Sequence, residues 1–227
     1  MDLSTLKEFE EDTAAFVPKF SVKWKNESLT QKLLGWLLFF NPKYMTGYIT
    51  TLYPLVYFPS KDHYEKNPLN SLMVLAHERV HLLDSIRYGM WFKFSYLLPQ
   101  VLFVPLFVAS IGCLIGNLKL VSLILLVLGL VALIPWPSPW RVNWEKRGYA
   151  MTLATNYWLF GSIPDPLKQS VRDHFLDWSY FKMARSPEDI DKWLEDIVAS
   201  IENGTICSDG AYYNVRRFLS SRGLIQQ

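Results

Sequence analysis

Cysteine is scarce in this chain of 227 residues, which contains Cys113 and Cys207 and no other. The two lie far apart in the sequence, and Cys113 stands inside a long apolar run. Neither a disulfide framework nor a thiolate zinc site is therefore expected. Any metal ion would have to be bound by carboxylates and by histidine, which is itself rare at four residues.

An excess of charge of one sign is also missing. Lys and Arg together number 23 and Asp and Glu number 21, so the formal net charge is +2. Without a strong basic field, we expect no nucleic-acid partner. The segment Met1–Asp12 is acidic and lacks the cationic start and apolar core of a signal peptide, so we do not expect export.

Charge almost disappears over the 41 residues 96–136, where Lys119 is the single charged side chain. Gly116-Asn117 divides this stretch into two arms, Leu97–Gly116 and Leu118–Trp136, each about 20 residues or about 30 Å long as a helix. The pattern predicts a transmembrane helical hairpin that contacts membrane lipid. The alternatives are a hairpin buried in a large core and one that partner subunits cover.

Basic residues on both flanks of the hairpin predict its orientation. They are Arg79, Arg87 and Lys93 before it and Arg141, Lys146 and Arg147 after it. Because Lys and Arg favour the cytoplasmic side of a membrane, we expect both flanks to lie there. The predicted location is thus a membrane with the rest of the chain on its cytoplasmic side, and association with a virion is an alternative.

The remaining chain predicts an α+β fold that is mainly helical. Gly47–Phe58 is rich in β-branched and aromatic residues and predicts a strand, which Pro54 would confine to the edge of a sheet. Helices are expected at Leu69–Tyr88, before Gly89, and at about Asn143–Leu159. Further helices are expected after Pro166, after Ser186-Pro187 and around Tyr212–Ser221.

These elements suggest three parts. Residues 1–95 would form the N-terminal part of a catalytic domain, residues 96–136 the apolar hairpin, and residues 137–227 a helical C-terminal part. The predicted core is small, with an edge strand beside a long helix, and the hairpin interrupts it.

The chemistry is concentrated in the first long helix, where His77, Glu78 and His81 form an HExxH motif. Histidines four residues apart lie on one face of a helix, so both imidazoles can reach a single metal ion. Glu78 points elsewhere and can take a proton from water that the metal ion acidifies. The motif therefore predicts a metal site with a general base.

The third ligand decides the class of site. A metzincin would need Gly at position 84 and His at position 87, but Asp84 and Arg87 stand there. Glu145, on the helix that follows the hairpin, is the better candidate. His63, His174 and Asp84 are weaker ones, and Asp84 is poorly spaced to close a tetrahedron with both histidines.

HExxH with a downstream Glu resembles the gluzincin zinc metallopeptidases. The hairpin between the two motifs is similar to the layout of the integral-membrane metallopeptidases of the heat-shock membrane protease and prenyl-protein protease group. The resemblance covers about Gly47–Tyr157, and its specific motif is HExxH. It implies zinc bound by His77, His81 and Glu145, with Glu78 as the general base. The small size also resembles phage or bacterial proteins with a zincin core.

Two further side chains have candidate roles near the metal. Asp84 lies on the same helix face as the histidines and is placed to accept a hydrogen bond from an imidazole N–H. Tyr149, one turn after Glu145, is placed to stabilise a developing oxyanion. Surface exposure or packing are the alternative roles for these two residues.

The sequence thus predicts a zinc metallopeptidase that hydrolyses polypeptide substrates near a membrane by means of a metal-activated water. The predicted edge strand would bind the substrate by strand addition. The alternative is a non-catalytic structural or membrane-interaction protein, for example a virion or assembly component, with a zincin-like fold. A structural site would need a fourth protein ligand, whereas a catalytic site keeps a position for water.

Overall fold

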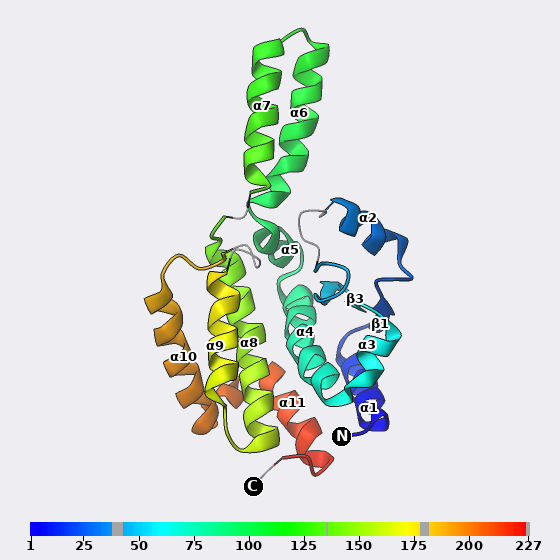
Figure 1. Cartoon of the computed structure of the whole chain (residues 1–227), viewed down its shortest axis with the longest axis vertical. Coiled ribbons are helices and arrows are strands. Elements are labelled where there is room, and N and C mark those ends of the chain that lie inside the picture. The colour runs from blue at the N-terminus through cyan, green and yellow to red at the C-terminus, as the bar shows by residue number, and fades with distance from the viewer. Residues whose placement is uncertain (38–42, 135, 178–181, 226–227) are drawn as a thin grey trace.

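The computed structural model describes residues 1–37, 43–134, 136–177 and 182–225. These residues form a mainly helical body with one small sheet, and a pair of helices projects from one end of it (Figure 1). This architecture confirms the predicted mainly helical α+β class.

The helices and strands follow one another along the chain with short connections. The helices are α1 (Leu3–Phe16), α2 (Leu29–Leu37), α3 (Lys61–Lys66), α4 (Pro68–Tyr88), α5 (Met90–Leu97), α6 (Phe103–Ile115), α7 (Lys119–Ala132), α8 (Pro139–Phe160), α9 (Asp165–Leu176), α10 (Pro187–Glu202) and α11 (Gly210–Ser221). The strands are β1 (Ser21–Trp24), β2 (Thr50–Leu52) and β3 (Leu55–Phe58), and short 3₁₀ turns occur at Gln100–Leu102 and Thr205–Ser208.

The sheet has the order β1-β3-β2, with β1 parallel and β2 antiparallel to β3. The prediction of a single strand over Gly47–Phe58 is therefore wrong, because that segment folds into two strands joined by a turn at Tyr53-Pro54. Proline cannot donate a ladder hydrogen bond, which is why the strand ends there. β2 forms one edge of the sheet, while β3 is central and largely buried.

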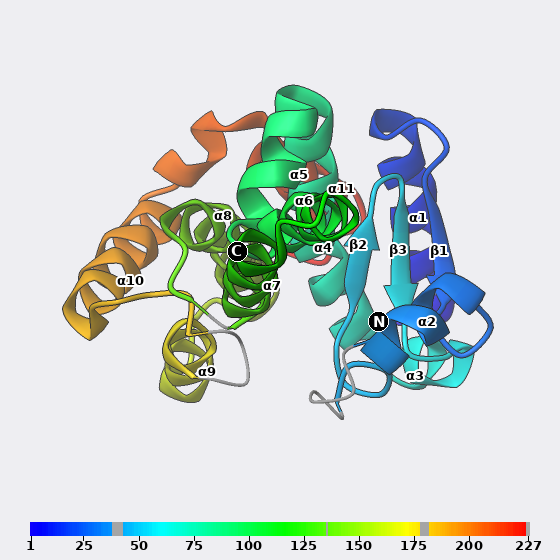
Figure 2. The ribbon, with the colours of Figure 1, turned by 90° about the horizontal axis from the view of Figure 1, so that it is seen from above.

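Helix α4 is the central element of the body, and its bounds agree closely with the prediction. The side chain of Asn67 caps its first turn, and Gly89 ends it with a positive φ of 56°. Viewed along the axis of the projecting helices, α4 lies between the sheet on one side and α8 on the other (Figure 2). Buried apolar residues of α4 and α8, among them Leu72, Leu75 and Met151, form the core between them.

Helix α8 starts earlier than predicted and ends where expected. Ser138 caps its first turn, and Gly161 ends it in the left-handed region with φ 74°. Helices α9, α10 and α11 pack around α8 on the side away from the sheet (Figures 1 and 2). At the opposite side of the body, α1 packs on α4, where the buried Arg79 donates a hydrogen bond of 2.6 Å to Asp12.

The apolar hairpin exists, but its arms are shorter than predicted. The first arm, expected over Leu97–Gly116, is interrupted: α5 ends at Leu97, and the chain bends by 94° before it continues as Gln100–Ile115. Helices α6 and α7 contain 13 and 14 residues. The break coincides with Pro99, which lacks the N–H that a continuous helix would need.

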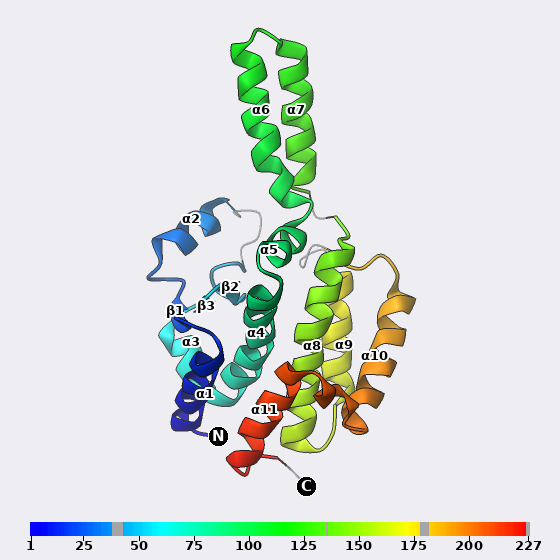
Figure 3. The ribbon, with the colours of Figure 1, turned by 180° about the vertical axis from the view of Figure 1, so that it is seen from behind.

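The hairpin is turned inside out relative to a soluble helix pair. Small residues line the contact between α6 and α7, namely Ser110, Ser122, Gly129 and Ala132. Large apolar side chains point outward along both helices, for example Val108, Ile115, Leu120 and Leu123. The pair projects away from the body (Figure 3), so a hairpin buried in the core of this chain is excluded. Within the described residues, no single helix is long and apolar enough to cross a membrane, although the bent pair of α5 with Gln100–Ile115 passes by length and composition.

Candidate metal centre

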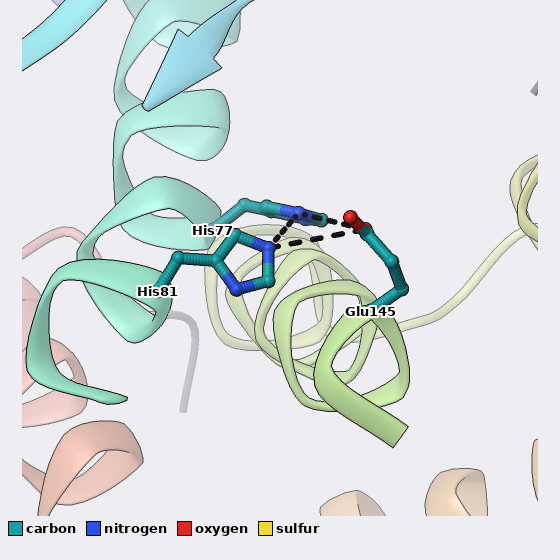
Figure 4. Close-up of side chains that lie close together, drawn as sticks. All are labelled: His77, His81 and Glu145. Carbon is teal, nitrogen blue, oxygen red and sulfur yellow. Dashed lines mark hydrogen bonds and ion pairs between the residues drawn. The ribbon is translucent and has the colours of Figure 1, made fainter. Parts of the chain in front are cut away.

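Two neighbouring helices bring three metal-ligating side chains together. His77 and His81 project from α4 one turn apart, and Glu145 projects toward them from α8 (Figure 4). The Nε2 atoms of the two imidazoles are 3.1 Å apart. Oε2 of Glu145 lies 3.5 Å from Nε2 of His77 and 3.8 Å from Nε2 of His81. These three side chains could hold a metal ion.

The spacing of these atoms fits a small tetrahedral ion. Two ligand atoms that each lie 2.0–2.1 Å from a tetrahedral zinc ion are separated by about 3.3 Å. The observed separations of 3.1, 3.5 and 3.8 Å bracket that value. The set of two imidazoles and one carboxylate is also a common donor set for catalytic zinc. The residues present therefore fit a zinc ion.

Gly148 permits the close approach of the two helices at this point. A Cβ atom at position 148 would lie 2.5 Å from Nε2 of His77 and 2.7 Å from Cε1. Such distances are far inside van der Waals contact, so any larger residue would displace the imidazole. The absence of a side chain at position 148 is thus a requirement of the site and not a matter of backbone freedom.

Hydrogen bonds on the far side of the ligands fix the orientation of His77. Its Nδ1 lies 3.1 Å from Oγ1 of Thr152, whose hydroxyl is 3.4 Å from the Gly148 carbonyl and can donate to it. Nδ1 of His77 then donates to Thr152, and Nε2 keeps its lone pair for a metal ion. Nδ1 of His81, in contrast, is buried without a hydrogen-bond partner among the described residues.

Tyr96 at the end of α5 holds the third ligand. Its hydroxyl donates a short hydrogen bond to Oε1 of Glu145, so Oε2 is the oxygen that faces the imidazoles. The Tyr96 ring also contacts the His81 ring, with centroids 5.9 Å apart. Burial alone would raise the pKa of the Glu145 carboxyl, but hydrogen bonds from His77 and His81 outweigh burial and hold that pKa well below its usual value.

Glu78 is next to His77 in the sequence but points away from the three ligands. Its Oε2 accepts a hydrogen bond of 2.6 Å from the Thr51 hydroxyl, on the edge strand β2. The carboxylate is half-buried between the α4 helix and the sheet edge. The candidate general base and the edge strand that was predicted to bind substrate are therefore in direct contact.

Asp84 does not make the predicted contact with an imidazole N–H. Its carboxylate is buried and accepts a hydrogen bond of 3.0 Å from Nε of Arg147, which also donates to Asp209 at 2.9 Å. Burial raises the pKa of the Asp84 carboxyl, although Arg147 acts in the opposite direction. This network joins α4 and α8 to the segment that begins α11, and Arg147 takes the position at which an imidazole was expected.

The other predicted residues lie around the site or outside it. The Tyr149 ring meets the His77 ring edge to face, with centroids 4.8 Å apart, and also packs against His174 and Phe175. His174 contacts Tyr149 and is not one of the three ligands. His63 lies exposed on α3 and also stands apart from the cluster.

Sequence reasoning missed four residues that support the site: Thr51, Tyr96, Gly148 and Thr152. Gly148 and Thr152 follow Glu145 by one and two helical turns, so the helix prediction already placed them beside it. Tyr96 was assigned to the apolar hairpin, and no sequence pattern links it to Glu145. Comparison of the chain with protein-family models, curated proteins and solved structures finds no match.

Proposed function

We propose that this protein is a zinc-dependent metallopeptidase of the gluzincin type with a small zincin-like core. The observation that carries the proposal is the convergence of His77, His81 and Glu145 on one point, with Glu78 beside them and directed at a sheet edge. In this assignment the first three residues bind zinc, and Glu78 is the general base.

The number of ligands supports catalysis over a structural role. Within the part of the chain that the structure describes, the cluster consists of three His and carboxylate side chains. A structural zinc site is closed by four protein ligands, whereas a catalytic site has three and keeps the fourth position for water or substrate. A carboxylate in the position of Glu78 also has no use in a purely structural site.

The residues of the chain divide the work of peptide hydrolysis. A zinc ion in this site would polarise the scissile carbonyl and lower the pKa of water. Glu78 takes the proton from the attacking water and delivers it to the leaving nitrogen. Thr51 positions the Glu78 carboxylate through its hydrogen bond, and Tyr96 positions Glu145 in the same way.

The edge strand β2 offers a way to bind a polypeptide substrate. It pairs with β3 on one side, and its other edge adjoins α4, which carries the metal ligands. An extended peptide that adds to this edge gains main-chain hydrogen bonds without a requirement for a particular sequence. Because Thr51 contacts Glu78, such a peptide would lie next to the base.

The apolar hairpin supports a location at a membrane. The outward side chains of α6 and α7 are large and apolar, and Lys119 at the start of α7 is the one charged residue of this pair. We place the hairpin in lipid, with the metal site on the cytoplasmic side because the flanks are basic. Substrates would then be polypeptides at or near the membrane surface.

Metal content and peptide cleavage test the proposal together. Purified wild type should contain about one zinc per chain, which His77→Ala and Glu145→Ala should lose and Glu78→Gln should retain. On a library of fluorogenic peptides, Glu78→Gln should lower turnover by at least about 100-fold. His63→Ala is the matched control, because His63 is exposed on α3 and away from the cluster.

Two results would contradict the proposal in different ways. Zinc that survives Glu145→Ala would show that another residue is the third ligand. Stoichiometric zinc combined with equal, negligible cleavage by wild type and Glu78→Gln would replace the peptidase by a structural zinc protein.

A further inference from the structure

The apolar surface of the hairpin continues onto the body. Helices α2 and α5 lie at the end of the body from which α6 and α7 project (Figures 1 and 3). One face of α2 exposes Leu29, Leu33 and Trp36, which are spaced by four and three residues. A face of α5 exposes apolar side chains in the same way, namely Met90, Trp91, Phe94 and Leu97. We call these two faces together the collar.

The α2 face of the collar is unpartnered because the opposite face of the helix is the one that packs. Gln31 is buried and accepts a hydrogen bond of 2.6 Å from the Tyr44 hydroxyl. Gly35 packs so closely on Met45 that a Cβ atom there would lie 2.9 Å from its side chain. The helix is therefore held with its polar and small residues inward and its leucines and tryptophan outward.

Tryptophan is concentrated at this end of the molecule. Among the described residues, the exposed tryptophans are Trp36 (72%), Trp91 (55%), Trp136 (44%) and Trp140 (44%). Two belong to the collar, and the other two lie between the end of α7 and the first turn of α8, at the base of the hairpin. Tryptophan is enriched where a protein meets the headgroup level of a bilayer.

Charge is distributed as unevenly as tryptophan. The chain as a whole is nearly balanced, but no Asp or Glu occurs over residues 28–61 or 85–144. These two segments contain α2, α5 and the hairpin, and their exposed charges are basic: Lys32, Lys43, Arg87, Lys93 and Lys119. A surface that is apolar, rich in tryptophan and fringed by cations complements a bilayer with anionic headgroups.

We propose that the collar is a lipid-contact surface that lies at the headgroup level of an anionic bilayer around the base of the inserted hairpin. The proposal rests on the membrane placement made under the proposed function, and it is independent of the metal chemistry. It adds α2, which lies more than fifty residues before the hairpin, to the membrane-contacting part of the chain. The body would then be held by contacts around the hairpin base as well as by the hairpin.

Site-specific fluorescence tests the contact directly. The two native cysteines are replaced by serine, and an environment-sensitive fluorophore is attached through Leu33→Cys on α2 or Phe94→Cys on α5. Phe107→Cys reports on the hairpin, and Phe160→Cys, at the end of α8 remote from the hairpin, is the control with similar exposure. Each protein is mixed with vesicles of phosphatidylcholine, alone or with about one third phosphatidylserine.

Blue shifts at positions 33, 94 and 107, with no shift at position 160, are expected. At positions 33 and 94, half of the shift should be reached with about tenfold less lipid when phosphatidylserine is present, because several cations gain from the surface potential. The same shift at equal lipid in both vesicle types would overturn the anionic preference.

The other outcomes separate this inference from the proposed function. A shift at position 107 without one at 33 and 94 would overturn the collar and leave the hairpin in lipid. The absence of a shift at all four positions would overturn both the collar and the membrane placement. Shifts at 33 and 94 that depend on protein concentration and not on lipid would assign the surface to a second copy of the chain.

Discussion

The metal centre and the hairpin solve opposite packing problems. Between α4 and α8, imidazoles, carboxylates and a guanidinium are buried and meet one another at hydrogen-bonding distances. Between α6 and α7, the inward residues are small, and the large apolar side chains point away from the protein. Polar groups are inside in one region, and apolar groups are outside in the other.

The difference shows what each region requires from its surroundings. A buried polar group costs free energy unless it finds a partner, and in the body the ligands, Arg147 and Thr152 largely supply one another. An exposed apolar surface of this size requires a partner that the chain itself does not provide. A metal ion would complete the first region, and lipid would complete the second.

The same substitution should have opposite effects in the two regions, and this is the largest effect we expect. In Gly148→Ala, the new methyl group would meet Nε2 of His77 at 2.5 Å, so the ring must move from its place beside His81. Zinc affinity should fall by at least about 100-fold, comparable with the loss of a ligand contact. Titration with zinc against a competing chelator measures this change.

The matched variant is Gly112→Ala in α6. A Cβ atom at position 112 would meet nothing within 4 Å, and alanine favours a helix over glycine by about 1 kcal/mol. We therefore expect unchanged zinc affinity and a slightly more stable hairpin. Equal zinc affinity in both variants would show that α4 and α8 can separate without loss of the site, and it would break the comparison.

Lysine gives a second contrast. Lys25 is fully buried and donates a hydrogen bond of 2.7 Å to the Tyr44 carbonyl, whereas Lys119 at the tip of the hairpin is exposed. Burial lowers the pKa of Lys25 from 10.5 to about 8. Between these two pH values the unfolded chain binds a proton that the folded chain has released, so the free energy of unfolding rises with pH.

Lys25→Met should remove that rise. Relative to this variant, the wild type should gain up to about 3 kcal/mol in the free energy of unfolding between pH 8 and pH 10.5, and nothing below pH 8. Denaturant titration of both proteins in one detergent measures the difference, and Lys119→Met is the control that should follow the wild type. Parallel curves for the wild type and Lys25→Met would show that the ammonium group is solvated.

The local parts of this structure could be predicted from the sequence. Asn67-Pro68 and Gly89 mark the ends of α4, and the HExxH spacing alone puts two imidazoles on one face. Glu145 was identified from its position on the next long helix, and the structure places it beside both histidines. These predictions depend on residues within a few helical turns, where spacing determines direction.

What failed depends on contacts between distant segments. The strand expected at Gly47–Phe58 is a hairpin of two strands because Pro54 turns the chain back, and the partner of β3 on its other side, β1, gave no clear pattern. The first hairpin arm ends early because the chain bends near Pro99, although its composition is uniform. Asp84 bonds to Arg147 because α8 packs across it, which spacing along α4 does not reveal.

Tyr96 joins the two regions that differ so strongly, and its loss should have the smallest effect of the three. Its backbone carbonyl accepts a hydrogen bond from Arg141, and its hydroxyl donates to Glu145. Tyr96→Phe keeps the ring on His81 but leaves Oε1 of Glu145 without its donor, so zinc affinity should fall by about tenfold with little change in stability. Trp144→Phe, which removes the indole donor to Ser95, is the control for a general loosening between α5 and α8. If both variants weaken zinc equally, the effect comes from that packing; if Tyr96→Phe acts alone, the hydroxyl at the base of the hairpin sets which oxygen of Glu145 faces the metal.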